Sequence, residues 1–195
     1  MKKLLQLLKN PFAFVEDKKL FLVGISTFIF GIFLAYYFQL QQQILRLNIS
    51  ETPTLKQVII WHVIIVASLT IVFFILGKII NKKTRFIDIL NTVLIALIPI
   101  YISFFQNFNN FLTEETEKML NAIKDGSIYT QSPPISFIFV GLAGFLFFIY
   151  YIYLLFIGFK TSTNAKKIWH YIVFFILLIV TDILTSGLIN SISLL

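Results

Sequence analysis

The stretch LLIVTDILTSG, residues Leu177–Gly187, lies inside an apolar run that extends from Ile168 to Leu194. A helix needs about 20 apolar residues to cross a lipid bilayer, and this run is longer than that. Its one carboxylate is Asp182. The stretch therefore predicts a membrane-spanning helix, and it raises the question of what Asp182 binds there.

The whole chain shares this apolar character. Of its 195 residues, 58% are hydrophobic and 13% are charged, which is about half the usual share of charged residues. The absence of cysteine excludes disulfides, thiolate metal sites and cysteine nucleophiles. The net charge of +7 would suit nucleic acid, but in so apolar a chain we attribute it to basic loops on one side of a membrane. We expect a lipid bilayer, and no nucleic acid, as the partner.

Four further apolar runs are long enough to cross the bilayer. No alternation of period two is evident in them, so a β-barrel is not expected, and only helices then satisfy the backbone in lipid. The sequence predicts an all-α, polytopic transmembrane helix bundle over residues 20–195. Its five spans are 20–38, 58–76, 86–105, 135–159 and 168–194.

The basic residues predict the orientation of these spans. Five precede the first span, four lie between the second and third, and three lie between the fourth and fifth, whereas the two alternate loops hold two each. The positive-inside rule then places the N-terminus in the cytoplasm and the C-terminus outside. Abundant Phe, Ile, Asn and Lys are typical of an AT-rich bacterial genome, so we expect the bacterial cytoplasmic membrane.

Two segments are expected to lie along the membrane. Residues 1–19 form a cytoplasmic, basic amphipathic segment with a break at Pro11, which would rest on the anionic inner leaflet; the alternative is a frayed tail. The stretch TEETEKMLNAIKDG, residues Thr113–Gly126, predicts a short surface helix on the outer side. We expect Thr113 to cap this helix and Gly126 to end it.

Polar residues inside the spans are the candidates for function. Asp182 is 15 residues from Lys167, which places it roughly 22 Å from the cytoplasmic edge. His62 is six residues from Lys56, or about 9 Å from the outer edge. It therefore lies at nearly the same level in the membrane as Asp182, and an Asp182–His62 pair could link two spans. The alternative is a protonated Asp182 that bonds to Thr185, Ser186 or a neighbouring backbone carbonyl.

A second aspartate lies near the cytoplasmic edge. Asp88 and His170 are each three residues inside a basic residue, so they share a level and could pair. Asp88 is also shallow enough to be solvated or paired with Arg85.

The third span holds two further polar or kinking candidates. Asn91 lies within it, and Pro99 cannot donate a hydrogen bond to the helix, so Pro99 is expected to kink the span.

No enzyme site is recognisable. The two membrane aspartates differ by roughly 17 Å in depth, too far for a dyad that shares a proton. Ser186 lacks a G-x-S-G context, and with two histidines in the chain and no H-E-x-x-H there is no metal motif. We expect no catalytic, cofactor-binding or metal-binding residue and no cofactor.

Three stretches of the chain carry a resemblance to a known family. They are NPFAFVEDKK (10–19), GKIINKKTRFIDILNTVLIALIPIYIS (77–103) and YIYLLFIGFKTSTNAKKIWH (151–170). In these stretches the chain resembles the Yip1-domain family of small polytopic membrane proteins. The resemblance implies a non-enzymatic membrane protein of the bacterial type, because the acidic segment tied to GTPase binding in eukaryotic relatives is absent from its short N-terminus.

Two functions fit these observations. The first is a membrane-organising or adaptor protein that contacts a second copy of itself or other membrane proteins through lipid-facing helices and basic inner loops. The second is a small permease or channel subunit that uses Asp182, His62, Asn91 and Pro99 along a polar path. A continuous water-accessible cavity that reaches mid-membrane would distinguish the second from the first.

Overall fold

Five long helical segments dominate the computed structural model, which describes residues 2–50, 52–126 and 134–193. Each is long and apolar enough to cross a membrane, which confirms the expected all-α bundle with five spans. The spans are formed by α3 (Asp17–Tyr37), α4 (Leu55–Ile80), α5 (Phe86–Ala96) with α6 (Ile98–Ser103), α8 (Ile135–Thr163) and α9 (Ile168–Ser193).

Helix α4 extends beyond its apolar run, 58–76, at both ends. At the start of α4, the Thr54 side chain accepts the N–H of Gln57 while the Gln57 side chain accepts the N–H of Thr54. This reciprocal capping box satisfies two of the backbone groups that a helix start leaves unpaired. The predicted break in the third span is confirmed, because α5 ends at Ala96 and α6 begins two residues later, with Pro99 in its first turn.

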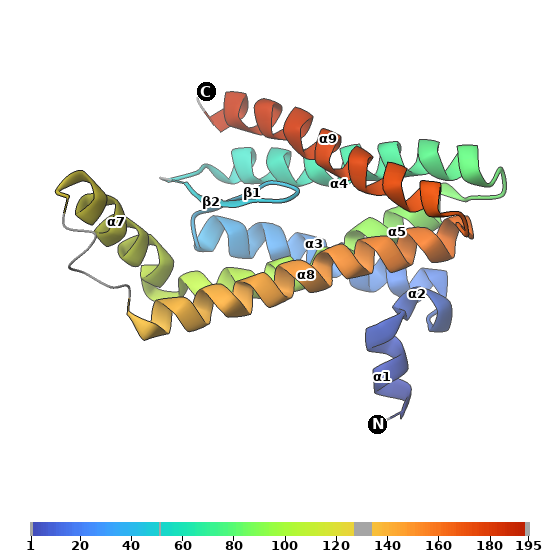
Figure 1. Ribbon diagram of the computed structural model, residues 1–195, viewed down its shortest axis with the longest axis horizontal. Helices are drawn as coiled ribbons and strands as arrows, with labels where there is room; N and C mark the ends of the chain where they lie inside the picture. Colours follow the sequence, from blue (N-terminus) through green and yellow to red (C-terminus); the bar gives the residue numbers. More distant parts are fainter. Residues whose placement is uncertain (1, 51, 127–133, 194–195) are drawn as a thin grey trace.

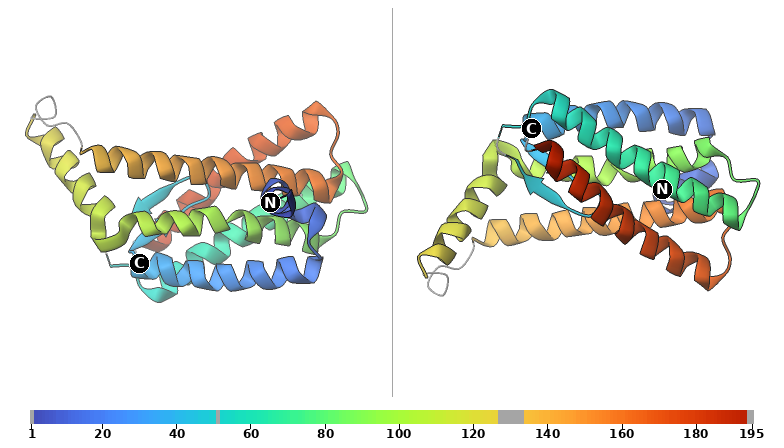
Figure 2. Two further views of the ribbon diagram at one scale, coloured as in Figure 1. Left: turned by 90° about the horizontal axis from the view of Figure 1, so that it is seen from below. Right: turned by 90° about the horizontal axis from the view of Figure 1, so that it is seen from above.

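The segment α5–α6 lies at the centre of the bundle. It packs against α3, α4 and α8, and α9 packs on the far side of α4 (Figures 1 and 2). Aromatic rings fill the contact of α4, α8 and α9, where Phe174 stacks on Phe73 with ring centroids 4.6 Å apart and lies 5.0 Å from Phe159. All three rings are fully buried.

A short hairpin, which the sequence did not lead us to expect, follows α3. Its strands β1 (Leu40–Gln42) and β2 (Leu47–Ile49) pair antiparallel, and the hairpin folds back into the bundle, in the opening between α8 and α9 (Figures 1 and 2). Leu40 and Ile44 are buried in the core there. We call this the hairpin end of the bundle and the opposite end, which carries α1, the N-terminal end.

The N-terminal segment consists of α1 (Lys2–Lys9) and α2 (Pro11–Phe14), so the predicted break at Pro11 is present. Figure 1 shows α1 pointing away from the bundle, across the direction of the spans. The hydroxyl groups of Tyr150 and Tyr153 donate to the carbonyls of Leu8 and Lys9, at 2.9 and 2.7 Å. Helix α8 therefore fixes the direction in which α1 leaves the bundle.

The predicted surface helix is present as α7 (Phe111–Lys124). It follows the segment η1 (Phe104–Asn110), in which 3₁₀ turns are interrupted by non-helical backbone at Asn107, Phe108 and Asn109. The prediction that Thr113 caps it was wrong, because Thr113 lies inside the helix and its N–H and hydroxyl bond to the Asn107 side chain. Asn109 and Asn110 adopt left-handed conformations, and Asn110 takes the cap position three residues before Thr113. Gly126 follows the end of the helix with a φ of 68°, a conformation that glycine adopts without strain.

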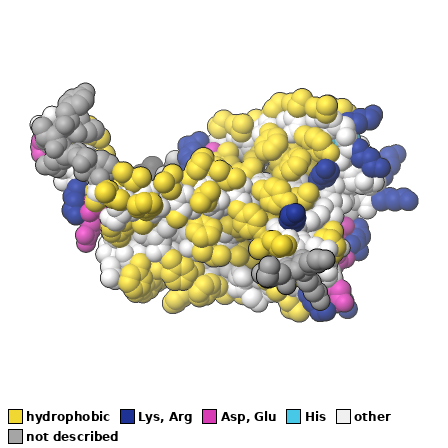
Figure 3. Space-filling model, turned by 60° about the horizontal axis from the view of Figure 1, so that its bottom comes forward, with side chains coloured by type: hydrophobic (Ala, Val, Ile, Leu, Met, Phe, Trp, Pro, Cys, Tyr) yellow, Lys and Arg dark blue, Asp and Glu magenta, His cyan; other side chains and the backbone are white. Residues whose placement is uncertain are grey.

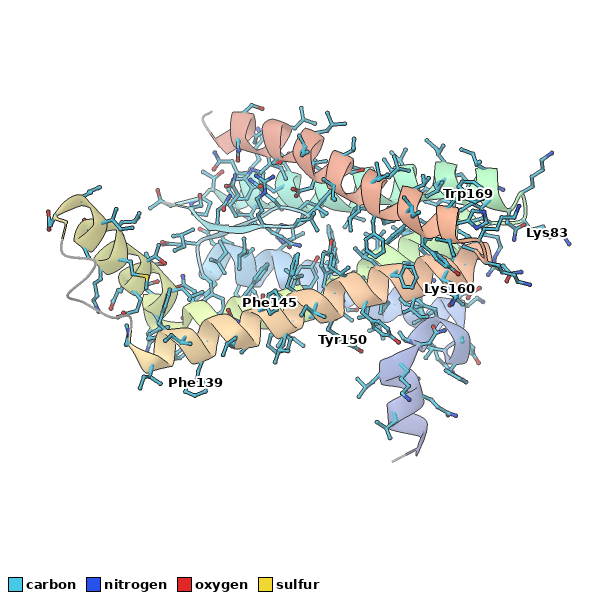
Figure 4. All side chains as sticks on the ribbon, viewed as in Figure 1. Lys83, Phe139, Phe145, Tyr150, Lys160 and Trp169 are labelled. Atoms are coloured by element: carbon cyan, nitrogen blue, oxygen red, sulfur yellow. The ribbon has the colours of Figure 1, made fainter. Side chains whose placement is uncertain are left out.

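The distribution of apolar and basic side chains over the surface is that expected of a helix bundle in lipid. Figure 3 shows apolar side chains spread over the flank, with most of the lysines and arginines on this face at one end. Figure 4 places Lys83, Lys160 and Trp169 at the N-terminal end. Helix α8 is the most exposed span, and along it Phe139 and Leu146 are each 67% exposed. The first and last described residues lie at opposite ends, as an odd number of spans requires (Figure 1).

Candidate functional site: a polar pocket at the N-terminal end

Arg85 connects two helix starts at the N-terminal end. It precedes α5, and its guanidinium donates to Asp88 in the first turn of α5 at 3.0 and 2.6 Å and to Asp17 at the start of α3 at 2.6 Å. Both carboxylates also complement the positive ends of their helix dipoles. The hydrogen bonds, first with Asp88 and then with Asp17, raise the pKa of Arg85 above its ordinary value. The predicted pairing of Asp88 with Arg85 is thus present.

Hydroxyl and amide groups extend this cluster toward α8. Asn91 is 1% exposed and donates through Nδ2 to the backbone carbonyl of Asp17 at 3.1 Å. The hydroxyl groups of Thr92 and Ser162 both donate to the backbone carbonyl of Asp88, at 2.9 and 3.3 Å. Oδ1 of Asn91 is buried and bonds to none of the described residues. The cluster therefore joins α3, α5 and α8 and keeps one acceptor unused.

These groups surround a pocket of about 200 Å³. Seven of its eight lining residues come from the three stretches that carry the family resemblance, so the fold brings together segments more than 60 residues apart in the chain. Gly158 permits this approach, because a Cβ there would lie 2.5 Å from Thr92 and 2.8 Å from Phe12. The lining residues are Phe12, Asp17, Leu20, Arg85, Asp88, Asn91, Thr161 and Ser162.

The side chains of this pocket offer hydrogen-bonding groups of both kinds. Two acidic side chains face one basic side chain, and Asn91 offers a free acceptor, so the pocket suits a group that donates hydrogen bonds. Ser162 donates to a backbone carbonyl and to no base among the described residues, so the pattern of an activated nucleophile is not met there. Groups of three or more side chains suited to a metal ion are also absent from the described residues.

Asp182 lies at the other end of the bundle with partners that we did not predict. Its Oδ1 accepts the backbone N–H of Leu45 at 2.9 Å, and its Oδ2 accepts Nη2 of Arg46 at 3.1 Å. Thr185 and Ser186 bond instead to the backbone carbonyl of Asp182. Both predicted alternatives for the Asp182 carboxyl are therefore replaced by an ion pair with the hairpin.

Neither histidine meets an aspartate. Nδ1 of His62 bonds to the carbonyl of Val58 in its own helix at 2.9 Å, and the ring stacks against Tyr101. His170 lies beside Trp169, with ring centroids 4.2 Å apart, and Asp88 is held by Arg85. Matching depth was not sufficient to pair these residues, because depth does not fix which face of a helix a side chain occupies.

The residues that sequence reasoning missed are Asp17, Arg46 and Ser162. A signal for Arg46 was present, because residues 45–50, LRLNIS, alternate between apolar and polar side chains, as a strand does. Asp17 and Ser162 have no comparable signal, since an acidic first turn and a serine near a helix end are common in any bundle.

Comparison with known proteins gives one match. The family model for the Yip1 domain matches residues 10–187. No curated protein and no solved structure matches the chain. The matched region contains every lining residue of the polar pocket and the whole of the hairpin.

Proposed function

Because the chain belongs to the Yip1 domain family, we propose that it is a non-enzymatic membrane-organising protein that acts as an adaptor for other membrane proteins. It would lie in the bacterial cytoplasmic membrane with its N-terminal end in the cytoplasm, where the more basic loops lie. Its five spans make it an integral membrane protein. The adaptor role, the orientation and the location are the proposal.

One observation favours the adaptor role over the permease role: the polar pockets at the two ends of the bundle are separated by a layer of buried side chains. A pocket at the hairpin end, lined in part by Ser103 and Phe148, shares no lining residue with the N-terminal pocket. Asn91 and Ser103, one from each pocket, are twelve residues apart, or about 18 Å along the span. The side chains between them on the central span are largely buried, among them Val93 and Leu97.

The exposed flank of α8 is the surface that such an adaptor would offer to a partner helix. Its apolar side chains are open from Ile135 to Ile149, and a Cβ added at Gly141 would have nothing within 4 Å. Small residues allow helix backbones to approach closely in lipid, where packing drives association. A larger side chain at Gly141 would therefore obstruct a partner helix without contacting the rest of this chain.

The test combines copurification with a flux measurement. The tagged chain is extracted from native membranes in mild detergent, and we expect it to copurify with an untagged copy or with another membrane protein. Gly141→Leu should reduce this recovery, while Gly187→Leu, a matched glycine of α9 with equally open space, should not. In proteoliposomes the chain should give no solute flux above empty vesicles. A flux that Asp182→Asn abolishes at normal protein level would overturn the adaptor role.

A further inference from the structure

The pocket at the hairpin end has a composition unusual for the flank of a membrane protein. It has a volume of about 180 Å³, and its lining residues come from the hairpin, α6, η1 and α8. Polar and apolar side chains share its wall. The lining residues are Gln43, Ile44, Leu45, Arg46, Leu47, Ile100, Ser103, Gln106, Gly144 and Phe148.

Arg46 brings hydrogen-bond donors to this pocket that the protein does not use. One of its nitrogens, Nη2, bonds to Asp182, while Nε and Nη1 bond to none of the described residues. The side chain is 55% exposed, against 4% for Asp182. A guanidinium carries five N–H donors and no acceptor. The free N–H groups of Arg46 are therefore available to an acceptor from outside the chain.

Two glutamines add one unpaired hydrogen-bond acceptor and one unpaired donor. Gln43 is 2% exposed and its Nε2 donates to Asn190, but its Oε1 has no partner among the described residues. Nε2 of Gln106 is likewise buried without a partner there. Buried polar atoms are almost always paired in folded proteins. A ligand that paired these atoms would accept hydrogen bonds from Arg46 and Gln106 and donate one to Gln43.

The charge balance narrows the choice of ligand. Arg46 and Asp182 already neutralise each other, and a net charge added in a region of low dielectric constant is costly. A zwitterionic group adds none. A phosphate could accept from Arg46 and Gln106, while an ammonium with N–H groups could donate to Gln43.

We propose that this pocket binds the headgroup of a zwitterionic phospholipid with a primary ammonium, that is, an ethanolamine phospholipid. The acyl chains would lie along the exposed apolar side chains of α8, such as Phe145 and Ile149. Figure 4 shows α8 running past the hairpin at this end, with Phe145 labelled on it. The assignment does not depend on the adaptor role.

The experiment uses two lipids that differ only in the substituents on the headgroup nitrogen, which are hydrogens in one and methyl groups in the other. Ethanolamine and choline phospholipids with identical acyl chains are both zwitterionic, but the choline group has no N–H. The purified full chain is mixed with equal amounts of both in detergent, and retained lipid is counted by native mass spectrometry. One hydrogen bond to a charged group corresponds to a preference of about tenfold, which is the expected result for the ethanolamine lipid.

Matched variants test whether lipid binding depends on this pocket. A Cβ at Gly144 would lie 2.7 Å from the side-chain amide of Gln106, whereas one at Gly141, nearly one turn away on α8, meets nothing within 4 Å. Gly144→Ala should reduce the retention of both lipids, because Gln106 faces the phosphate that they share, and Gly141→Ala should keep it, with equal unfolding midpoints. Should Gly144→Ala fail to fold, Gln106→Leu makes the same test by removing the donor. Gln43→Leu removes the acceptor for the ammonium and should reduce the preference for the ethanolamine lipid to near unity.

Three outcomes would overturn the assignment. The first is equal retention of the two lipids by the unmodified chain. The second is a preference that Gln43→Leu leaves unchanged. The third is stronger retention of an anionic glycerol phospholipid, which would contradict the charge argument. Displacement of the lipid by millimolar free phosphoethanolamine would assign the pocket to a soluble compound instead; retention of the lipid under that challenge supports the lipid form.

Discussion

Arg46 in the hairpin donates to Asp182 in α9 at 3.1 Å, although 136 positions separate them in the chain. The two members of this pair differ in burial, because the Arg46 side chain is 55% exposed and that of Asp182 is 4% exposed. Loss of one partner from an ion pair costs most when the charge left behind is buried. The pair should therefore respond asymmetrically to substitution.

Arg46→Met leaves the buried carboxylate without its cation and should lower the free energy of unfolding by about 2 kcal/mol, discounted for the exposure of Arg46. Asp182→Asn should cost less, since an asparagine can still accept the N–H of Leu45, and this variant should insert and fold. Reversible unfolding in mixed micelles measures both, with the double variant completing the cycle. A larger cost for Asp182→Asn would contradict the asymmetry.

Gly158→Ala should destabilise the bundle at the N-terminal pocket. The added Cβ would lie 2.5 Å from Thr92 and 2.8 Å from Phe12, and overpacking of this kind typically costs about 1–3 kcal/mol. The unfolding midpoint of the purified chain is the measurement. Gly187→Ala, where nothing lies within 4 Å, is the matched control and should be close to neutral. Equal midpoints for the two variants would show that α5 and α8 do not approach as closely as described.

The two tyrosine hydroxyls should control how α1 contacts the membrane. Because the chain has no cysteine, a probe on Leu5→Cys reports its surroundings without interference. In vesicles with anionic lipids, Tyr150→Phe with Tyr153→Phe should increase the mobility of this probe, since the bonds to the carbonyls of Leu8 and Lys9 are lost. Tyr36→Phe, in the span at the opposite end, should leave the spectrum unchanged. If the probe gave the same spectrum in the Leu5→Cys chain and in both of its tyrosine variants, the two tyrosine hydroxyls would not hold α1 in place.

The orientation is tested with reporters at both ends. A fusion after Leu195 should be active outside the cytoplasm, and a fusion ahead of Met1 should be active inside, because the more basic loops stay in the cytoplasm. Alkaline phosphatase and a fluorescent protein give opposite readings on the two sides. Reporters on the same side would contradict five crossings, and a reversed pair would contradict the orientation alone.

Local features were predictable from the sequence, and the distant pairing was not. The break near Pro99 and the pairing of Arg85 with Asp88 follow from neighbours within one helical turn. The partner of Asp182 required the hairpin to return into the bundle, and no spacing within α9 indicates that. The prediction that Thr113 caps α7 was wrong for a related reason. The Thr113 N–H donates to the side chain of Asn107 in the preceding segment, and the spacing within α7 does not indicate that contact.

The sequence by itself determined that this chain crosses a membrane five times and where each crossing begins and ends, to within a few residues. Those properties depend on the sum of apolar side chains over about 20 residues, which any linear reading contains. Only the tertiary structure decided which polar side chains meet, because that depends on the rotation of each helix about its axis and on a hairpin that returns between two spans. Arg46 reaches Asp182, and the polar pocket assembles from three distant stretches, for that reason.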